Sequence, residues 1–545
     1  MSGCLKKNTS VDVVVVGAGF SGLYLLHRLR KHGFTSRVFE RGGNVGGTWY
    51  WNRYPGARCD VESMQYSYSF DENLQQEWHW PEKFSGQPDI LAYANHVADR
   101  FDLRKDIEFN TEVKEASFDE RAQRWIIQTN KDEKVKTQHF IMATGCISTA
   151  QTPEIEGLED FRGNTYHTGN WPHKEIDFSS QRIAVVGAGS SGIQSIPVLA
   201  EQAHHLTVFQ RTPNYSIPSQ NEVMSEDYEK YWKSDYAARR EEMRYTSHGS
   251  LKDLNDTSAL SVSEEERQRT YKKRWEIGGA GYLGAFNDLL TKIESNDTAS
   301  EFVREKIREI VKDPITAEKL SPKTYPIGTK RICIDSGYFA TFNRKNVELV
   351  DLSKGMIEKI TATGLIANGT EYSFDAIIFA TGFDAMTGSL FNVDIKGRNN
   401  KRLKEKWFAG PRTYLGLMTE AFPNLFMITG PGSPSVKSNM IISIEQHVDL
   451  VINNLIHMRE HDLQLMEPQI EAENDWVDHV QAVANETLFP RANSWYMGAN
   501  IPGKPRLFTP YIGGVGRYRK ICEEIVTQGY KGFKFEIDNT KMAAE

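Results

Sequence analysis

The sequence predicts an α/β fold with two Rossmann-like domains and a helical insertion. One local pattern occurs twice: a strand of β-branched residues runs into a glycine-rich turn and then into an apolar helix pattern. The turns read GAGFSG at 17–22 and GAGSSG at 187–192. Residues 220–325 differ from their flanks, because they are dense in charge, lack β-rich runs and repeat apolar residues at helical spacing. These observations predict two parallel sheets, with the helical insertion in the second domain.

The first glycine turn has the surroundings of a dinucleotide site. An unbroken apolar run at 11–16 predicts a buried parallel strand, and the residues after the turn predict a helix. In such a unit the first glycine permits the tight turn, the second lets the backbone approach a pyrophosphate, and the third lets helix and strand pack closely. These roles fall to Gly17, Gly19 and Gly22. The next predicted strand ends at Glu40, where a carboxylate can accept a hydrogen bond from a ribose hydroxyl.

The second turn belongs to a repeat of the same unit. Val208-Phe209-Gln210-Arg211 stands where the first unit has Val38-Phe39-Glu40-Arg41, at the same distance from the first glycine. A carboxylate would repel a 2′-phosphate, whereas Arg211 and Thr212 can donate hydrogen bonds to one. We therefore expect FAD at the first turn and NADPH at the second. The residues of the second unit expected to contact NADPH are Gly187, Gly189, Ser190, Ser191, Gly192, Gln194, Arg211 and Thr212.

Composition excludes several classes of protein. The 545 residues carry a formal net charge of -7, which argues against a nucleic-acid partner. No apolar run is long enough for a membrane span, so we expect no membrane partner. The five cysteines are scattered and form no cluster with metal-ligand spacing, so we expect no metal and a reduced, cytoplasmic protein. The expected partners are small molecules, and the sequence slightly favours a monomer while leaving the oligomeric state open.

Residues 46–60 read GGTWYWNRYPGARCD and combine a glycine pair, three consecutive aromatic residues close behind it and several charged side chains. The aromatic rings could form the wall of a site for a flat ligand ring, or they could fill an aromatic core loop. The density of polar residues beside them favours the ligand wall. This segment and the first turn are expected to supply these FAD contacts: Phe20, Gly47, Thr48, Trp49, Tyr50, Trp51 and Asp60. Arg58 is expected on the NADPH side.

A linker between the two turns reads FRGNTYHTGNWP at 161–172. Its histidine, His167, is a candidate general base, because imidazole titrates near neutral pH. The segment also connects the two predicted domains, where a hinge needs an anchor. This position favours His167 as an organiser of domain and cofactor geometry over a direct part in the chemistry.

Two spacings resemble motifs of the Baeyer–Villiger monooxygenases, which are flavoenzymes that insert an oxygen atom beside a ketone carbonyl. The linker matches FxGxxxHxxxWP through Phe161, Gly163, His167 and Trp171. Residues 46–60 match GGxWxxxxYPGxxxD at every fixed position. The resemblance implies oxidation of ketones to esters or lactones by NADPH and O2, through a peroxyflavin.

The resemblance also implies roles for single residues. Arg331 would stabilise the anions of the reaction, Lys330 would contact the NADPH phosphate, and Asp60 would position Arg331. A guanidinium suits this task because it is permanently charged, although a Lys-Arg pair by itself is more often a solvated surface. Trp495 falls in a loop that resembles the family's mobile lid and would meet the nicotinamide nucleotide. Further positions match FAD contacts of the family: Tyr66, Val113 and Met440.

Two Ala-Thr-Gly tripeptides, at 143–145 and 380–382, each follow an apolar strand pattern and indicate where the chain crosses between domains. The predicted plan comprises an FAD domain at 1–146 and 385–545 with a mobile loop near 490–508, an NADPH domain at 147–219 and 326–384, and the helical insertion at 220–325.

Three other functions share parts of this pattern. A flavin-containing or N-hydroxylating monooxygenase, acting on amines or sulfides, also has both glycine turns but needs no oxyanion arginine. A disulfide reductase would need a redox cysteine pair near the flavin, and the sequence has no Cys-x4-Cys or Cys-x2-Cys. A catalytically silent, cofactor-binding sensor is disfavoured by the intact pair of Asp60 and Arg331.

Overall fold

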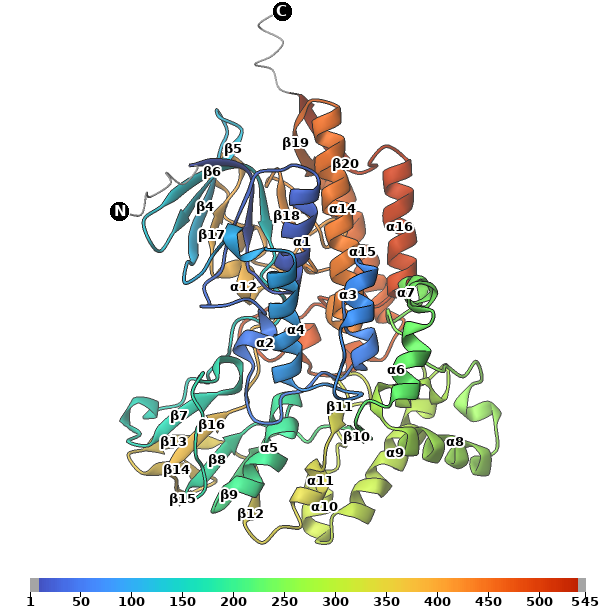
Figure 1. Ribbon diagram of the computed structural model, residues 1–545. Coiled ribbons are helices and arrows are strands. Elements are labelled where there is room, and N and C mark those ends of the chain that lie inside the picture. The colour runs from blue at the N-terminus through green and yellow to red at the C-terminus, as the bar shows by residue number, and fades with distance from the viewer. Residues whose placement is uncertain (1–8, 538–545) are drawn as a thin grey trace, which may run out of the picture.

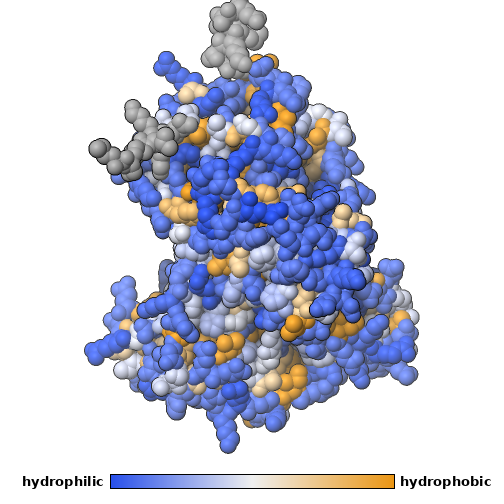
Figure 2. All heavy atoms as spheres, viewed as in Figure 1, coloured by the Kyte–Doolittle hydropathy of each residue, from blue (hydrophilic) through white to orange (hydrophobic). Residues whose placement is uncertain are grey.

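The computed structural model describes residues 9–537 and contains two separate, mainly parallel sheets covered by helices. The predicted fold class is confirmed. In Figure 1 the first sheet lies in the upper half of the molecule and the second in the lower half. Figure 2 shows that this face of the molecule is mostly hydrophilic and is hollowed on one side between the two halves.

The first sheet holds the N-terminal unit and two strands from the C-terminal part of the chain. Its strands are β1 (Ser10–Val16), β2 (Ser36–Phe39), β3 (Ile107–Glu108), β4 (Val113–Asp119), β5 (Arg124–Thr129), β6 (Lys134–Met142), β17 (Asp394–Lys396) and β18 (Leu425–Met427). The order is β17-β4-β5-β6-β1-β2-β3, with β18 also beside β6. β1 is parallel to β2 and β6, whereas β4, β5 and β6 form an antiparallel meander.

The second sheet is parallel throughout its described strands. In spatial order these are β12 (Val347–Asp351), β9 (His205–Gln210), β8 (Arg182–Val186), β16 (Ala376–Phe379) and β7 (Asn164–His167). A small antiparallel meander packs against it and consists of β13 (Ile357–Thr361), β14 (Gly364–Ala367) and β15 (Thr370–Ser373). β8 leads into the second glycine turn as β1 leads into the first, so the two units follow the same course.

Each glycine turn is followed by a helix that packs on its sheet. These helices are α1 (Phe20–Lys31) and α5 (Ser190–Gln202). α1 also packs against α14 (Met440–Glu460), and the Tyr24 hydroxyl donates to Asp449 Oδ1 over 2.7 Å. The C-terminal part of the chain therefore completes the core that the N-terminal unit begins.

The helical segment 220–325 contains α6 (Glu226–Lys233), α7 (Tyr236–Tyr245), α8 (Glu264–Ile277), α9 (Ile293–Ile310) and α10 (Pro314–Leu320). These helices divide between the two cores. Trp232 of α6 and Tyr236 of α7 are buried with the side chains of the first unit. Tyr271 of α8 and Phe302 of α9 are buried with those of the second unit. The segment thus bridges the two halves, and the domain boundaries derived from the sequence stay a prediction.

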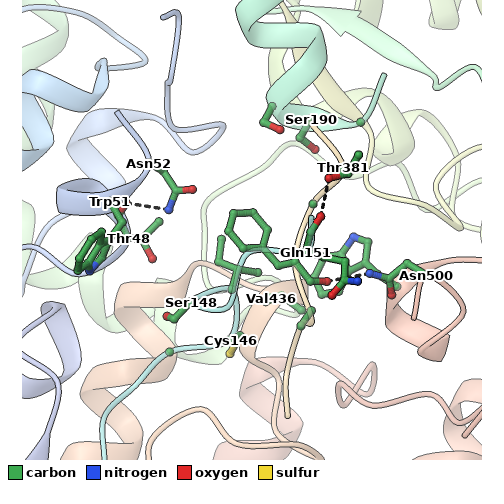
Figure 3. A pocket seen from close by; sticks show the side chains of 18 of the residues that line it. Thr48, Trp51, Asn52, Cys146, Ser148, Gln151, Ser190, Thr381, Val436 and Asn500 are labelled. Carbon is green, nitrogen blue, oxygen red and sulfur yellow. Dashed lines mark hydrogen bonds between the residues drawn. The ribbon is translucent and has the colours of Figure 1, made fainter. Parts of the chain in front are cut away.

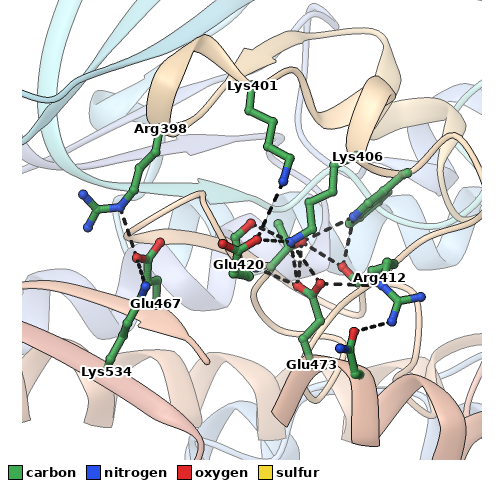
Figure 4. A network of polar contacts seen from close by, with 11 residues as sticks. Arg398, Lys401, Lys406, Arg412, Glu420, Glu467, Glu473 and Lys534 are labelled. Atoms are coloured by element: carbon green, nitrogen blue, oxygen red, sulfur yellow. Dashed lines mark hydrogen bonds and ion pairs between the residues drawn. The ribbon is translucent and has the colours of Figure 1, made fainter. Parts of the chain in front are cut away.

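An ion-pair network around the buried carboxylates of Glu467 and Glu473 joins elements of the C-terminal part of the chain to one another (Figure 4). Lys406 Nζ lies 2.9 Å from an oxygen of Glu420 and 2.9 Å from an oxygen of Glu473, whose side chain is fully buried. Glu467 on β19 (Leu463–Pro468) pairs with Lys534 on β20 (Phe533–Ile537) at 2.7 Å. Removal of one partner would leave a buried charge unpaired. These ion pairs therefore restrict the positions that the C-terminal helices can occupy.

The remaining helices and strands are α2 (Thr48–Trp51), α3 (Glu72–Glu77), α4 (Gln87–Arg100), α11 (Tyr338–Thr341), α12 (Gly388–Phe391), α13 (Leu403–Lys406), α15 (Ile470–Asn485), α16 (Val515–Thr527), β10 (Ser216–Pro218) and β11 (Cys333–Asp335). β10 and β11 form a parallel pair, and β11 directly follows the segment around residue 330. Within residues 9–537, none of the helices combines the length and the apolar character that a bilayer span requires.

Two glycines of the second turn should respond differently to an added methyl group. A Cβ on Gly192 would lie 2.4 Å from the Gly187 carbonyl oxygen, whereas a Cβ on Gly189 meets nothing within 4 Å. We expect Gly192→Ala to lower the free energy of unfolding by about 1–3 kcal/mol through overpacking. Gly189→Ala should change it by less than about 0.5 kcal/mol. Thermal unfolding without added nucleotide measures both, and equal losses would contradict the packing argument.

Candidate active site

The carboxyl ends of the two central strands open onto a cavity of about 1440 Å³. β1 ends at Val16 and β8 ends at Val186, and both residues line the cavity. Ligands of open α/β sheets bind at this end of the strands. Figure 3 shows Trp51 and Ser190 on opposite sides of the cavity. Residues of both predicted units therefore face one space.

The two helices that begin at this cavity are suited to bind phosphate. Their N-caps are Gly19 in α1 and Gly189 in α5, and neither helix has a side-chain cap or an acidic residue in its first turn. The first backbone N–H groups of a helix have no partner inside the helix and attract anions. Two such helix ends on one cavity fit two dinucleotides, so the residues present fit both FAD and NADPH.

Most of the predicted contacts line the cavity. On the FAD side these are Gly17, Gly19, Phe20, Glu40, Gly47, Thr48, Trp49, Trp51, Asp60, Tyr66, Val113 and Met440. On the NADPH side they are Arg58, Gly187, Gly189, Ser190, Ser191, Gln194, Arg211, Thr212, Lys330, Arg331 and Trp495. Gly22 and Gly192 instead pack helix against strand. Tyr50 is not among the lining residues, because its hydroxyl accepts from the Gly43 N–H at 3.0 Å and its ring lies against His173.

Glu40 and Gln210, which occupy matching places in the two units, point in different directions. Glu40 lines the cavity and accepts from the N–H groups of Ala18 at 2.8 Å and Gly42 at 2.7 Å. Gln210 is buried, and its Nε2 donates to the Lys319 carbonyl at 2.9 Å. The neutral amide that replaces a carboxylate at position 210 therefore does not affect the choice of ligand through a direct contact between Gln210 and the ligand. Arg211 and Lys330, which lie close enough for the charge of Arg211 to affect Lys330, are among the positive residues that line the cavity.

Asp60 and Arg331 form a two-pronged contact. Arg331 Nε donates to Asp60 Oδ2 and Nη2 donates to Asp60 Oδ1, each over 2.7 Å. Nη1 donates to the Val436 carbonyl at 3.0 Å. The negative charge of Asp60 raises the pKa of Arg331 above its ordinary value. The Arg331 side chain remains 35% exposed, and it lines the cavity.

The surroundings of Lys330 disfavour its positive charge, whereas those of its neighbour Arg331 favour a positive charge. Burial lowers the pKa of Lys330 to about 8, and the positive charge of Arg211 adds to this lowering. Its ammonium lies 4.6 Å from the centroid of the Tyr325 ring. A bound phosphate would favour the charged form of Lys330, because opposite charges stabilise each other.

The segment 46–60 is docked on the second unit by three of its residues. Tyr54 donates its hydroxyl proton to Gln194 Oε1 at 2.8 Å, and Gln194 Nε2 donates to the Arg58 carbonyl at 3.0 Å. Gly56 has φ +81°, and a Cβ there would lie 2.2 Å from the Gln194 carbonyl oxygen. Residues 54–56 of the segment thus pack against α5, and this contact places Asp60 near Arg331.

His167 lies where the two chain crossings meet. Its Nδ1 accepts from the Gly169 N–H at 2.9 Å, so the proton of the neutral ring is on Nε2. Nε2 is 3.2 Å from the Gln151 carbonyl and 3.3 Å from Thr381 Oγ1, which itself donates to that carbonyl at 2.5 Å. Gln151 follows the first crossing and Thr381 belongs to the second. The ring therefore links both crossings and does not line the cavity.

The other linker residues pack and do not face the cavity. Phe161 is buried against the second sheet, and a Cβ on Gly163 would collide with the Phe161 ring. Trp171 is buried beside Tyr166, with ring centroids 5.4 Å apart. Its backbone N–H also points to the Trp51 carbonyl at 3.4 Å, so the linker meets the segment 46–60.

Several lining residues carry no clear signal in the sequence. Val436 contributes a backbone carbonyl to Arg331, and a backbone group leaves no mark in the sequence. Gln151 is a single polar residue in a loop and has no motif around it. Asn500, which donates to the Phe383 carbonyl at 2.8 Å, lies in the predicted mobile loop near 490–508. Thr381 belongs to the second Ala-Thr-Gly tripeptide, and that recurrence is the signal that could have singled it out.

The described residues contain no group of three or more His, Cys, Asp or Glu that could hold a metal ion. Cys59 and Cys146 line the cavity but are free thiols. Burial raises the pKa of both thiols, to about 11 for Cys146, so they are protonated at neutral pH. Neither thiol has the low pKa of a redox cysteine.

Comparisons with known proteins agree with this geometry. The family model described as pyridine nucleotide-disulphide oxidoreductase matches residues 14–328. A Baeyer-Villiger monooxygenase of Pseudooceanicola batsensis is 39% identical over 523 residues, which cover 95% of this chain and 95% of that protein.

Solved structures resemble the whole chain. An oxidized steroid monooxygenase bound to NADP is 50% identical, with a TM-score of 0.92, and the match covers 96% of this chain and 99% of that one. A complex of OTEMO with FAD and NADP is 38% identical, with a TM-score of 0.93 and the same two coverages.

The stability that His167 provides should depend on pH. Burial lowers the pKa of His167 below its ordinary 6.5. The folded protein therefore favours the neutral ring. The contribution of His167 to the free energy of unfolding is complete above pH 6.5 and is lost as the pH falls through the lowered pKa. His167→Gln, which does not titrate, should cost about 1–2 kcal/mol at pH 8. Denaturant unfolding at pH 8 and pH 5 should show a smaller difference between the two proteins at pH 5; a constant difference would exclude this titration.

Proposed function

The chain belongs to the Baeyer–Villiger monooxygenases, and on that premise we propose how its residues carry out the reaction of that family. The enzyme uses FAD and NADPH to convert a ketone and O2 into an ester or lactone and water. When bound, FAD supplies the electrons that activate O2 and is reduced again by hydride from NADPH. One oxygen atom enters the product and the other leaves as water, so NADPH and a proton balance the reaction.

The observation that carries the assignment is the orientation of the Arg331 guanidinium. A guanidinium has five N–H groups, and contacts with Asp60 and Val436 use three of them within residues 9–537. The other two N–H groups are outside these three contacts, the side chain lines the cavity, and the Tyr496 hydroxyl lies close to it. Asp60 prevents the guanidinium plane from rotating, because both carboxylate oxygens of Asp60 accept hydrogen bonds from Arg331.

Negative charge develops on the substrate oxygen when a nucleophilic oxygen adds to the ketone carbon. A positioned donor that is already charged stabilises that oxygen without reorganisation at the moment of reaction. Arg331 meets this requirement, because the pKa shift caused by Asp60 keeps it charged at any working pH. We therefore assign Arg331 to the oxyanion and Asp60 to the orientation of Arg331.

The other residues bind and orient the cofactors in this proposal. The first turn and Glu40 hold FAD, and Trp49 and Trp51 of the segment 46–60 flank it. Arg211, Thr212 and Lys330 bind the 2′-phosphate of NADPH, which gives a preference for NADPH over NADH. His167 holds the two domains in a fixed relative position, because it links the two segments where the chain crosses between them. The cytoplasmic location and the monomeric state stay predictions.

Replacement of Arg331 should separate cofactor binding from oxygen transfer. Arg331→Ala should still bind FAD, because both glycine turns lie on other elements. Loss of one positioned oxyanion donor lowers rates by about 10²–10³, so ester formation should fall at least that far. The NADPH that is still consumed should yield hydrogen peroxide. Product analysis with a panel of linear, cyclic and aryl ketones, together with a peroxide assay, measures both.

Arg344→Ala is a matched control, because Arg344 is exposed and does not line the cavity. It should retain the parent rate and the parent ratio of ester to peroxide. Ester formation near the parent rate in Arg331→Ala would refute the role of this guanidinium. If the enzyme formed amine or sulfide oxides but no ester from any ketone, the heteroatom monooxygenase would replace this proposal.

A further inference from the structure

Tyr496 carries a buried polar group next to the Arg331 guanidinium. It stands in a short 3-10 helix at Trp495–Met497, within the predicted mobile loop near 490–508. Tyr496 is fully buried, and no other group within residues 9–537 forms a hydrogen bond with its hydroxyl. Arg331 lies close enough for the two side chains to act on each other. A buried hydroxyl without a partner is costly, so the guanidinium is the group that can satisfy it.

The packing around Tyr496 places its ring against the turn that also contacts Arg331. Val436, whose carbonyl accepts from Arg331 Nη1, is buried in the same cluster of side chains as Tyr496. The next residue, Lys437, has its Nζ 4.6 Å from the centroid of the Tyr496 ring. The Tyr496 carbonyl accepts from the N–H of Thr509 at 2.9 Å and from its Oγ1 at 3.0 Å. The ring and the backbone of Tyr496 are therefore both held, which gives the hydroxyl a fixed place.

A neutral phenol suits this place better than a second carboxylate would. Burial raises the pKa of Tyr496 to about 12, although the positive charge of Arg331 opposes this shift. The hydroxyl is therefore uncharged at neutral pH and can accept a hydrogen bond without cancelling the charge of the guanidinium. Beside the contacts with Asp60 and Val436, an N–H group is still left for the substrate oxygen. Such a contact fixes Arg331 at a further point and leaves its charge for the oxyanion.

The loop that carries Tyr496 also meets the cavity and the second chain crossing. Trp495 lines the cavity, and its ring centroid is 4.2 Å from that of Tyr496. Lys504 Nζ donates to Asp384 Oδ1 at 2.5 Å and to the Ala385 carbonyl at 2.8 Å, just after the second Ala-Thr-Gly tripeptide. A displacement of this loop would therefore also displace the Tyr496 hydroxyl from the guanidinium.

We propose that Tyr496 is a positioning residue: its hydroxyl accepts a hydrogen bond from Arg331 and makes the orientation of that guanidinium depend on the loop at 490–508. The inference rests on the proposed function, because it concerns the group assigned to the oxyanion. Arg331 is correctly oriented for oxygen transfer only when the loop is in place. Cofactor binding does not need the hydroxyl, since Tyr496 does not line the cavity.

Tyr496→Phe tests the proposal, because it removes the hydroxyl and keeps the ring. The full-length enzyme with FAD and NADPH is assayed for ester and for hydrogen peroxide, with a ketone that the parent enzyme converts. Tyr496→Phe should lower kcat for ester formation on the order of tenfold and should raise the share of NADPH that ends as peroxide. The dissociation constant of NADP+ should keep the parent value.

Two further variants separate positioning from a general effect on packing. In the Arg331→Ala background, Tyr496→Phe should cause no further loss of ester, because the guanidinium on which it acts is absent. Lys504→Ala, which releases the loop from Asp384, should raise the peroxide share of the parent enzyme and should raise it less in Tyr496→Phe. An unchanged peroxide share in Lys504→Ala would contradict the dependence on the loop.

Tyr338→Phe is the matched control, because the Tyr338 hydroxyl is also buried without a hydrogen-bond partner in the described part of the chain, and Tyr338 does not line the cavity. It should keep the parent rate and the parent ratio of ester to peroxide. FAD content and thermal unfolding show that each variant is folded. Parent levels of ester and peroxide in Tyr496→Phe, or an equal loss of ester in the parent and Arg331→Ala backgrounds, would overturn the inference while the proposed function stands. No lactone or ester from any ketone with the parent enzyme would refute the proposed function itself.

Discussion

The paired hydrogen bonds between Asp60 and Arg331 join two stretches of chain that are 271 residues apart, and the site is arranged around them. Asp60 ends a segment that belongs to the first unit, and Arg331 immediately precedes β11, which pairs with β10. A partly exposed ion pair contributes little net stability, so its effect lies in orientation. The paired hydrogen bonds fix the plane of the Arg331 guanidinium at the point where the two halves of the protein meet.

That contact requires the two halves to keep one relative position. Gly56 allows the segment 46–60 to press against α5, and the Tyr54 hydroxyl holds it there through Gln194. His167 joins the two crossings of the chain through Gln151 and Thr381. A small rotation between the sheets would separate Asp60 from Arg331 and would also move the two phosphate-binding helix ends apart. Packing of the linker and binding of the cofactors are therefore coupled.

The sequence predicts the parts of this arrangement that follow from local chemistry. The strand, turn and helix of each unit are local patterns, so both units and the place of Arg211 follow from the residues alone. The direction of Gln210 does not, because it depends on the Lys319 carbonyl of α10 in the folded chain. The backbone carbonyl of Val436 has no sequence signal, and the division of the helices at 220–325 between two cores depends on long-range packing. The pairing of Asp60 with Arg331 came from resemblance to a family, since no local rule brings together residues so far apart.

The central claim is that Asp60 acts through Arg331, and a double-mutant cycle measures this directly. The four proteins are the parent enzyme, Asp60→Ala, Arg331→Ala and the double variant, each compared by kcat/KM for ester formation. If Asp60 serves only to orient Arg331, the double variant should be about as slow as Arg331→Ala, with a coupling energy of about 1–3 kcal/mol. Losses that add independently, with no coupling between the two residues, would contradict the account.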